Sequence, residues 1–147
     1  MNNKNIKADK MRYQKNSSAY GLILLGMAIS VHVLFSIITP KTVVPSITTA
    51  AEILLNIVLL LVTFLAAEKC KAYDKKWGMY IFIVAAIHVL RIFFEPSSLL
   101  RKGQITGFAF TLIAIELIAT AALFVIAGYI TIKKHDKLKA HLKELGE

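Results

Sequence analysis

Four long apolar stretches, separated by short polar segments, set the pattern of the chain. They cover residues 19–39, 46–67, 77–95 and 105–132, and in each the apolar residues form nearly continuous runs. About 20 apolar residues in a helix are enough to cross the ~30 Å hydrocarbon core of a bilayer. The backbone polar groups of such a span must be satisfied internally, which a helix achieves. The pattern therefore predicts an all-α membrane protein with four transmembrane helices.

Polar residues and prolines mark the ends of these spans. Pro40 is expected to end the first span, and Ser46 is a suitable N-cap for the second. Pro96 is expected to stop the third span, because proline lacks the backbone N–H that a helix needs. Residues 1–18 and 133–147 are predicted to be basic tails. The second tail is amphipathic, so it suits a helix on the membrane surface, a docking helix, or a simple extension of the last span.

The positive charge of the chain is unevenly distributed. The formal net charge is +9, with five Lys or Arg in each tail and four in residues 68–76, but only one and two in the other two loops. By the positive-inside rule, both termini and the middle turn are predicted to be cytoplasmic. These charges also favour contact with anionic lipid headgroups. No basic run is interleaved with aromatic residues, so nucleic acid is not an expected partner. The compact plan and the charge asymmetry favour a bacterial inner (cytoplasmic) membrane.

The two halves of the chain resemble each other. His32 begins the triplet His-Val-Leu and is followed by Pro40 eight residues later, and His88 begins the same triplet with Pro96 at the same distance. This similarity predicts a duplicated helical hairpin. Each hairpin has an even number of spans, so the two copies would share one orientation, with a pseudo-two-fold axis along the membrane normal. His32 and His88 would then be symmetry mates.

Six polar side chains inside the predicted spans are candidates for one cluster. An ionisable group in the hydrocarbon core costs a few kcal/mol unless it has a partner, so intramembrane ionisable residues are candidates for a functional site. The predicted topology places five of the six in the outer half of the bundle and the sixth, Glu116, just beneath them. This intramembrane polar cluster consists of His32, Glu52, Asn56, His88, Arg91 and Glu116.

Two interpretations of this cluster remain open at the level of sequence. In the first, the cluster is structural: Arg91 pairs with Glu52 or Glu116, and the other groups bond across helices. Arg91 is also one helical turn from Glu95, which would give an outer pair of little consequence. In the second, the cluster is an ion or substrate site at the interface between the repeats, with a carboxylate that carries a proton.

Cofactor and enzyme chemistry have little support in the sequence. No metal site is expected, and the one cofactor considered is a b-type haem held by His32 and His88, for which two histidines are a weak signal. The single cysteine, Cys70, excludes an internal disulfide. The chain has no glycine-rich phosphate loop, metal-binding helix motif or nucleophile elbow. It is therefore not expected to be an enzyme.

Two functions remain. The first is a small accessory or scaffold subunit of a larger inner-membrane complex, whose partners are other membrane protein subunits. The alternative is a small proton-coupled secondary transporter working as a homodimer, because four helices have little interior with which to enclose a pathway alone. In the alternative, Glu116 or Glu52 would carry the proton and Arg91 would tune its proton affinity.

Overall fold

A computed structural model of the protein describes residues 16–40 and 42–144. These residues form helices and no strand. The predicted basic tail over residues 1–15 and the last residues, 145–147, lie outside the described part of the chain. The helices are α2 (Ser17–Ile38), α3 (Ile47–Lys71), α4 (Lys75–Arg91), α5 (Glu95–Arg101) and α6 (Gly107–Glu144).

The prediction of four apolar spans is confirmed. Four helical segments are long and apolar enough to cross a membrane, with α4 and α5 together forming the third. Large apolar side chains cover the outside of the bundle, as a lipid environment favours and water does not. Examples with more than half of their surface exposed are Phe35, Leu61, Ile83 and Phe108.

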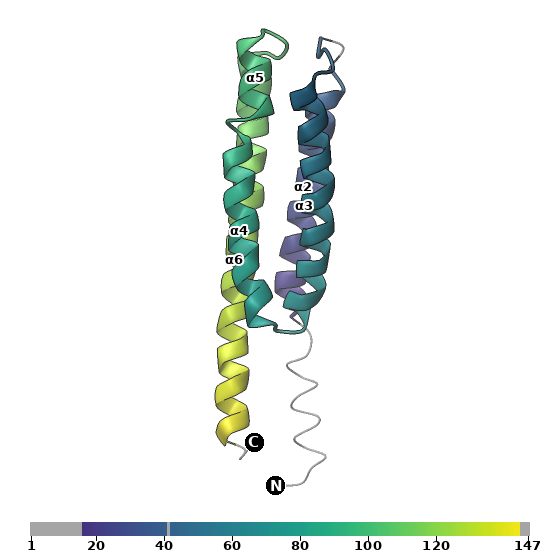
Figure 1. The fold of residues 1–147 in the computed structure, drawn as a ribbon. Helices are drawn as coiled ribbons and strands as arrows, with labels where there is room; N and C mark the ends of the chain where they lie inside the picture. Colours follow the sequence, from purple (N-terminus) through teal and green to yellow (C-terminus); the bar gives the residue numbers. More distant parts are fainter. Residues whose placement is uncertain (1–15, 41, 145–147) are drawn as a thin grey trace.

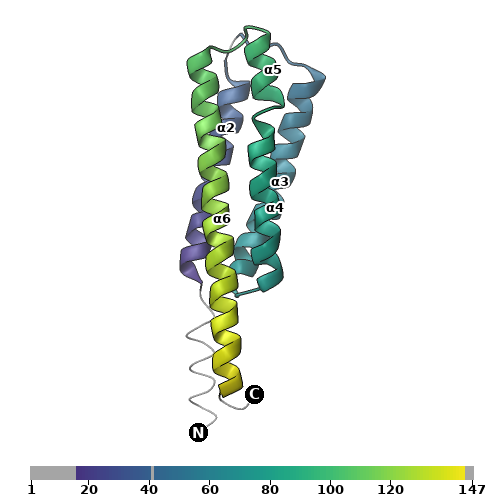
Figure 2. The ribbon, with the colours of Figure 1, turned by 90° about the vertical axis from the view of Figure 1, so that its left-hand side faces the viewer.

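The helices pack as two antiparallel hairpins side by side (Figure 1). One hairpin is α2 with α3, and the other is α4 and α5 with α6. Helix α6 packs against both α2 and α4, while α3 packs against α2 and α4 (Figure 2). The first helix begins, and the last helix ends, at the same end of the bundle.

Glycines allow the helices to approach closely at two positions. A Cβ added to Gly26 of α2 would collide with Cε1 of Phe124 in α6. A Cβ added to Gly128 of α6 would lie 2.7 Å from the carbonyl oxygen of Gly78 in α4. Small residues at such crossings let backbones pack tightly where no hydrophobic effect drives association. Helix α6 therefore approaches α4 closely within its own hairpin and approaches α2 closely across the two hairpins.

The third span departs from the prediction, because Pro96 begins a helix and does not end one. Helix α4 ends at Arg91, and after a short break α5 starts at Glu95 with Pro96 in its first turn. An unbroken helix would need an N–H at residue 96 to bond the carbonyl of Ile92, and the proline ring would clash with that carbonyl. Instead, the hydroxyl of Ser97 donates to the Ile92 carbonyl at 2.8 Å. Proline is well suited to a first helical turn, so the chain resumes a helix where the sequence predicted a loop.

The last span continues without a break into the predicted basic tail. Helix α6 has 38 residues, about 57 Å at 1.5 Å per residue, which is longer than a ~30 Å hydrocarbon core. Its lower part extends beyond the other helices (Figure 1). His135 bonds the backbone carbonyl of Tyr73 at 2.8 Å, and Lys75 bonds Asp136 at 2.8 Å. Residues 133–144 of the predicted tail therefore continue α6 as one helix.

Candidate functional site

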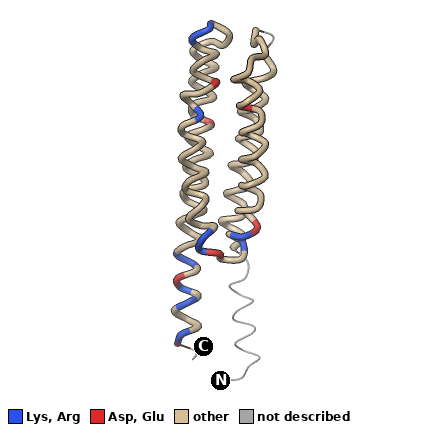
Figure 3. The backbone as a smooth tube through the Cα atoms, in the orientation of Figure 1, with Lys and Arg blue, Asp and Glu red and all other residues tan. Residues whose placement is uncertain are grey.

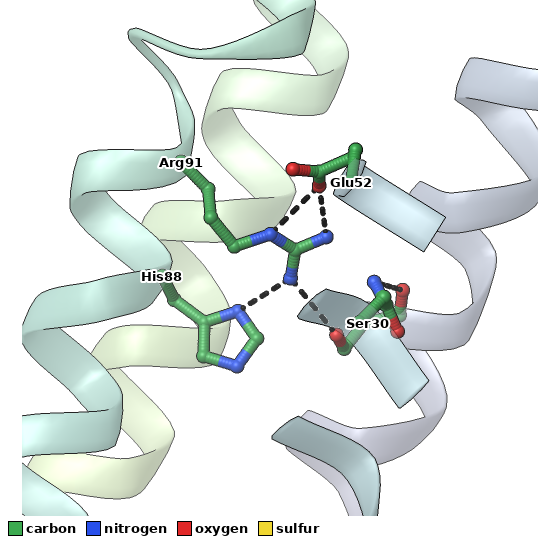
Figure 4. Close-up of polar contacts among 5 residues, drawn as sticks. Ser30, Glu52, His88 and Arg91 are labelled. Carbon is green, nitrogen blue, oxygen red and sulfur yellow. Dashed lines mark hydrogen bonds and ion pairs between the residues drawn. The ribbon is translucent and has the colours of Figure 1, made fainter. Parts of the chain in front are cut away.

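A buried ion pair between Arg91 of α4 and Glu52 of α3 lies at the centre of the polar cluster (Figure 4). The Nε and Nη2 atoms of Arg91 donate to the same carboxylate oxygen, Oε1, at 2.8 and 2.5 Å. The two side chains are 1% and 3% exposed. Of the three partners considered for Arg91, the structure therefore gives Glu52, and not Glu95 or Glu116.

The third nitrogen of Arg91 contacts two further side chains. Nη1 lies 3.1 Å from Nδ1 of His88 and 3.4 Å from the hydroxyl of Ser30 in α2. A guanidinium only donates, so Nδ1 of His88 must accept, and the proton of the neutral ring is then on Nε2. The His88 ring also packs edge-on against Phe124, with ring centroids 5.4 Å apart. One arginine thus connects α2, α3 and α4 through its three nitrogens.

Asn56 extends this network by one turn along α3. Its amide nitrogen donates to the backbone carbonyl of Ser30 at 3.3 Å, while its buried carbonyl oxygen has no protein partner among the described residues. Asn56, like Arg91, is fully buried. The buried group formed by Ser30, Glu52, Asn56, His88 and Arg91 is called the Arg91 network below.

The Arg91 network separates two apolar layers of the bundle. One layer, towards the end where α2 begins, includes Ile23, Ile81 and Phe124. The other, towards the opposite end, includes Ile37 and Leu117. With His88 neutral, the network carries one positive and one negative charge and is balanced overall. This arrangement is suited to fixing the rotation of α2, α3 and α4 relative to one another.

His32 and Glu116 form a separate pair on the outside of the bundle. Nδ1 of His32 in α2 lies 3.0 and 3.1 Å from the two carboxylate oxygens of Glu116 in α6. The side chains are 67% and 27% exposed, in contrast to the Arg91 network. They lie in a shallow hollow of about 340 Å³, lined also by small residues such as Ala28 and Ala119. The six residues predicted as one cluster therefore form two groups, because the helix rotations turn His32 and Glu116 outward.

Glu95 is a buried polar residue that the sequence interpretation placed at the outer rim. The break after Arg91 turns it inward, and the residue is 1% exposed. The hydroxyl of Thr49 donates to Oε1 of Glu95 at 2.5 Å, and Oε2 is buried without a hydrogen-bond partner among the described residues. The Glu-Pro step was the available signal, since a proline break redirects the side chains next to it.

The haem hypothesis is not tested by this geometry. His88 lies inside the bundle and accepts from Arg91, whereas His32 lies outside and contacts Glu116. Haem ligation would require both contacts to be replaced, so we expect protein purified from cells supplied with haem to lack a Soret band. Among the described residues, no three His, Cys, Asp or Glu side chains are grouped closely enough to hold a metal ion.

The fold and these polar groups define the class of the molecule: a multi-pass helical membrane protein with a buried ionic network and an outward-facing ionisable pair. Comparisons of the chain with protein-family models, with curated proteins and with solved structures give no match.

Proposed function

We propose that the protein is an accessory or scaffold subunit of a larger inner-membrane complex, and that the His32–Glu116 face is its docking surface. The observation that carries the proposal is the exposure of this pair on the membrane-facing side of the bundle. His32 lies six residues before the last residue of α2, which is about 9 Å along the helix. Glu116 lies nine residues after the first residue of α6, which is about 14 Å. Both positions therefore fall within the apolar part of the spans.

An ionisable pair facing lipid is expensive. Polar and ionisable side chains in membrane spans usually face a protein interior or a water-filled cavity. Covering this pair with a helix from another subunit would replace lipid by polar or backbone groups that can bond to it. The small side chains of Ala28 and Ala119 in the hollow allow a partner helix to approach closely. The leading occupant is therefore a transmembrane helix of a different membrane protein.

The charge distribution supports an orientation with both ends of the chain in the cytoplasm. Lys and Arg gather at the end of the bundle from which α6 projects, with a smaller group at the opposite end (Figure 3). By the positive-inside rule, the first end faces the cytoplasm of a bacterial cell. The basic extension of α6 then provides a second contact, either for the partner or for anionic lipid headgroups. We assign no catalytic role to the chain.

A duplicated hairpin remains part of the proposal. The sequence similarity between the two halves supports it, as does the packing of two antiparallel hairpins side by side. The copies have diverged in their polar groups, since His88 is buried and its counterpart His32 is exposed. Under this interpretation His88 serves the packing of the interior, whereas His32 serves the contact with a partner.

The test is extraction of the tagged protein at native expression level in a mild detergent, followed by identification of co-purifying proteins and measurement of native mass. We expect the protein with its natural sequence to co-purify with another membrane protein in stoichiometric amount. Glu116→Gln should lose most of that partner while keeping its helix content and monodispersity. Ile118→Ala is the control: Ile118 is exposed on the same helix but, two residues from Glu116, lies on nearly the opposite side of it, so this variant should retain the partner. Equal recovery of the partner with all three proteins would show that the docking surface lies elsewhere.

The alternative, a proton-coupled homodimeric transporter, has one observation in its favour. A cavity of about 560 Å³ lies against Glu52 and Glu95, beside the Arg91 network. In this alternative the second copy covers the His32–Glu116 face, and a carboxylate carries the coupled proton. A homodimer without other companions would favour it. Glu116→Gln should then abolish coupled transport in a well-folded protein, and an unchanged transport rate would remove Glu116 as the coupling group.

A further inference from the structure

The cavity between α3 and the α4–α5 break combines polar and apolar walls. Its volume is about 560 Å³, within the range of small-molecule sites. Thr48, Glu52, Glu95 and Ser98 supply oxygen atoms, and Arg101 lies at its edge with an exposed side chain. The apolar lining residues are Ala51, Leu55, Phe93 and Phe94.

Glu95 gives this cavity a buried carboxyl group that forms no ion pair among the described residues. Arg91 is fully engaged with Glu52, His88 and Ser30, so it balances Glu52 and not Glu95. In the described part of the chain, no Lys, Arg or His forms an ion pair with Glu95, and its Oε2 atom has no hydrogen-bond partner. A buried carboxylate oxygen without a partner costs free energy that a cationic hydrogen-bond donor would recover. The missing partner is therefore a donor that carries positive charge.

We infer that the cavity binds the primary ammonium group of an amphiphile, with the ammonium at Glu95 and the apolar part against Leu55, Phe93 and Phe94. The inference goes beyond the proposed docking function, because the cavity is separate from the His32–Glu116 hollow. An ammonium donates to carboxylate and hydroxyl oxygens, and aromatic rings attract cations through their faces. The volume and the apolar walls fit an organic ligand better than a bare metal ion.

Two sources supply this chemistry: the headgroup of phosphatidylethanolamine and a free organic amine. In the first case Arg101 at the edge of the cavity suits the lipid phosphate. In the second case Arg101 stays solvated and only the ammonium is held. Both sources place the same group at Glu95, so one substitution tests the site and the choice of probe tells the sources apart.

The free-amine arm is calorimetric titration of the full-length protein in dodecyl maltoside with 2-phenylethylammonium. We expect saturable binding, no binding of the uncharged analogue 2-phenylethanol, and at least tenfold weaker binding by Glu95→Gln, which is about 1.4 kcal/mol. The lipid arm is native mass spectrometry after incubation with equal amounts of phosphatidylethanolamine and phosphatidylglycerol. If the natural protein retains the ethanolamine lipid and Glu95→Gln does not, the ligand is the lipid headgroup. Binding of the amine without such retention identifies a free amine.

Controls separate the site from general effects on the fold and from the docking surface. Glu144→Gln removes an exposed carboxylate near the far end of α6 and should leave binding unchanged. Ala51→Phe fills the cavity without altering a polar group, so it should abolish binding even if Glu95→Gln fails to fold. Glu116→Gln should bind normally, whatever its effect on partners. Absence of binding in both arms, or equal binding by the natural protein and Ala51→Phe, would overturn the inference.

Discussion

Breaking the Arg91–Glu52 pair should destabilise the bundle strongly. The perturbation is a double-mutant cycle with Glu52→Gln, Arg91→Met and the two combined. Glu52→Gln leaves a guanidinium that stays charged, at a position where its side chain is 1% exposed. Arg91→Met removes the hydrogen bonds to Glu52, His88 and Ser30 together. Each single change therefore strands buried polar groups that the other helices cannot satisfy.

The expected magnitude follows from the burial of both partners. Two opposite charges about 4 Å apart attract by roughly 4 kcal/mol at an effective dielectric constant of 20. Removing one partner of a buried pair costs about 3–5 kcal/mol, whereas individual hydrogen bonds between membrane helices average about 0.6 kcal/mol. We therefore expect each single variant of Glu52 or Arg91 to lose about 3 kcal/mol. The double variant should lose at least about 2 kcal/mol less than the sum of the two singles.

The assay is reversible unfolding in mixed dodecyl maltoside and dodecyl sulfate micelles, followed by circular dichroism. The control is the same cycle at Glu68 and Lys71, an exposed pair 3.9 Å apart on α3, where a coupling of about 0.5 kcal/mol or less is expected. Additive effects at Glu52 and Arg91, or single losses no larger than those at the control pair, would refute the interpretation that the Arg91 network holds the three helices together.

Three further predictions follow from other contacts. Gly26→Ala should lower the free energy of unfolding by about 1–3 kcal/mol in the same assay, because the new methyl group collides with Phe124; an unchanged value would contradict the close approach. Pro96→Ala should slow amide exchange in the interrupted turn of the third span, since it restores the missing donor; unchanged exchange would mean that proline is not the cause of the break. The hydrogen bond from Lys75 lowers the pKa of Asp136, so this contact stabilises the α6 extension above the ordinary carboxyl pKa and is lost as the pH falls through the lowered value. Lys75→Met should raise the midpoint of Asp136 in a carboxyl NMR titration, and equal midpoints in the two proteins would contradict the contact.

The four apolar spans could be predicted because they depend on nearby sequence. Runs of about 20 apolar residues identify membrane helices regardless of how the helices pack. Ser46 was expected to cap the second span, and its hydroxyl does accept from the backbone N–H of Thr49 at 3.3 Å. The composition of the core was harder to predict, because all sides of these helices are apolar and periodicity does not mark the buried face.

The partner of Arg91 could not be chosen from the sequence. Topology predicts the height of each polar group in the membrane, and both Glu52 and Glu116 were at suitable heights. The choice depends on the rotation of each helix about its axis, which close packing at Gly26 and Gly128 helps to set. That rotation brings Glu52 into the interior and turns Glu116 outward to His32.

The inward position of Glu95 depended on residues that follow it. Pro96 alone is compatible with the end of a helix or with the start of one. The second outcome requires another group to satisfy the Ile92 carbonyl, and the Ser97 hydroxyl does so. Such a local exchange of hydrogen bonds is visible only once the backbone path is known.

Site-specific photo-crosslinking in cells tests most directly whether the His32–Glu116 face is covered by another protein. A photoreactive amino acid would replace Ala119 in the hollow or, as a control, Leu61 on the exposed face of α3. We predict an adduct with a different membrane protein from position 119 and none from position 61. Adducts with lipid alone at position 119, or the same protein adducts from both positions, would contradict the proposed docking surface, and a self-adduct would favour the homodimer.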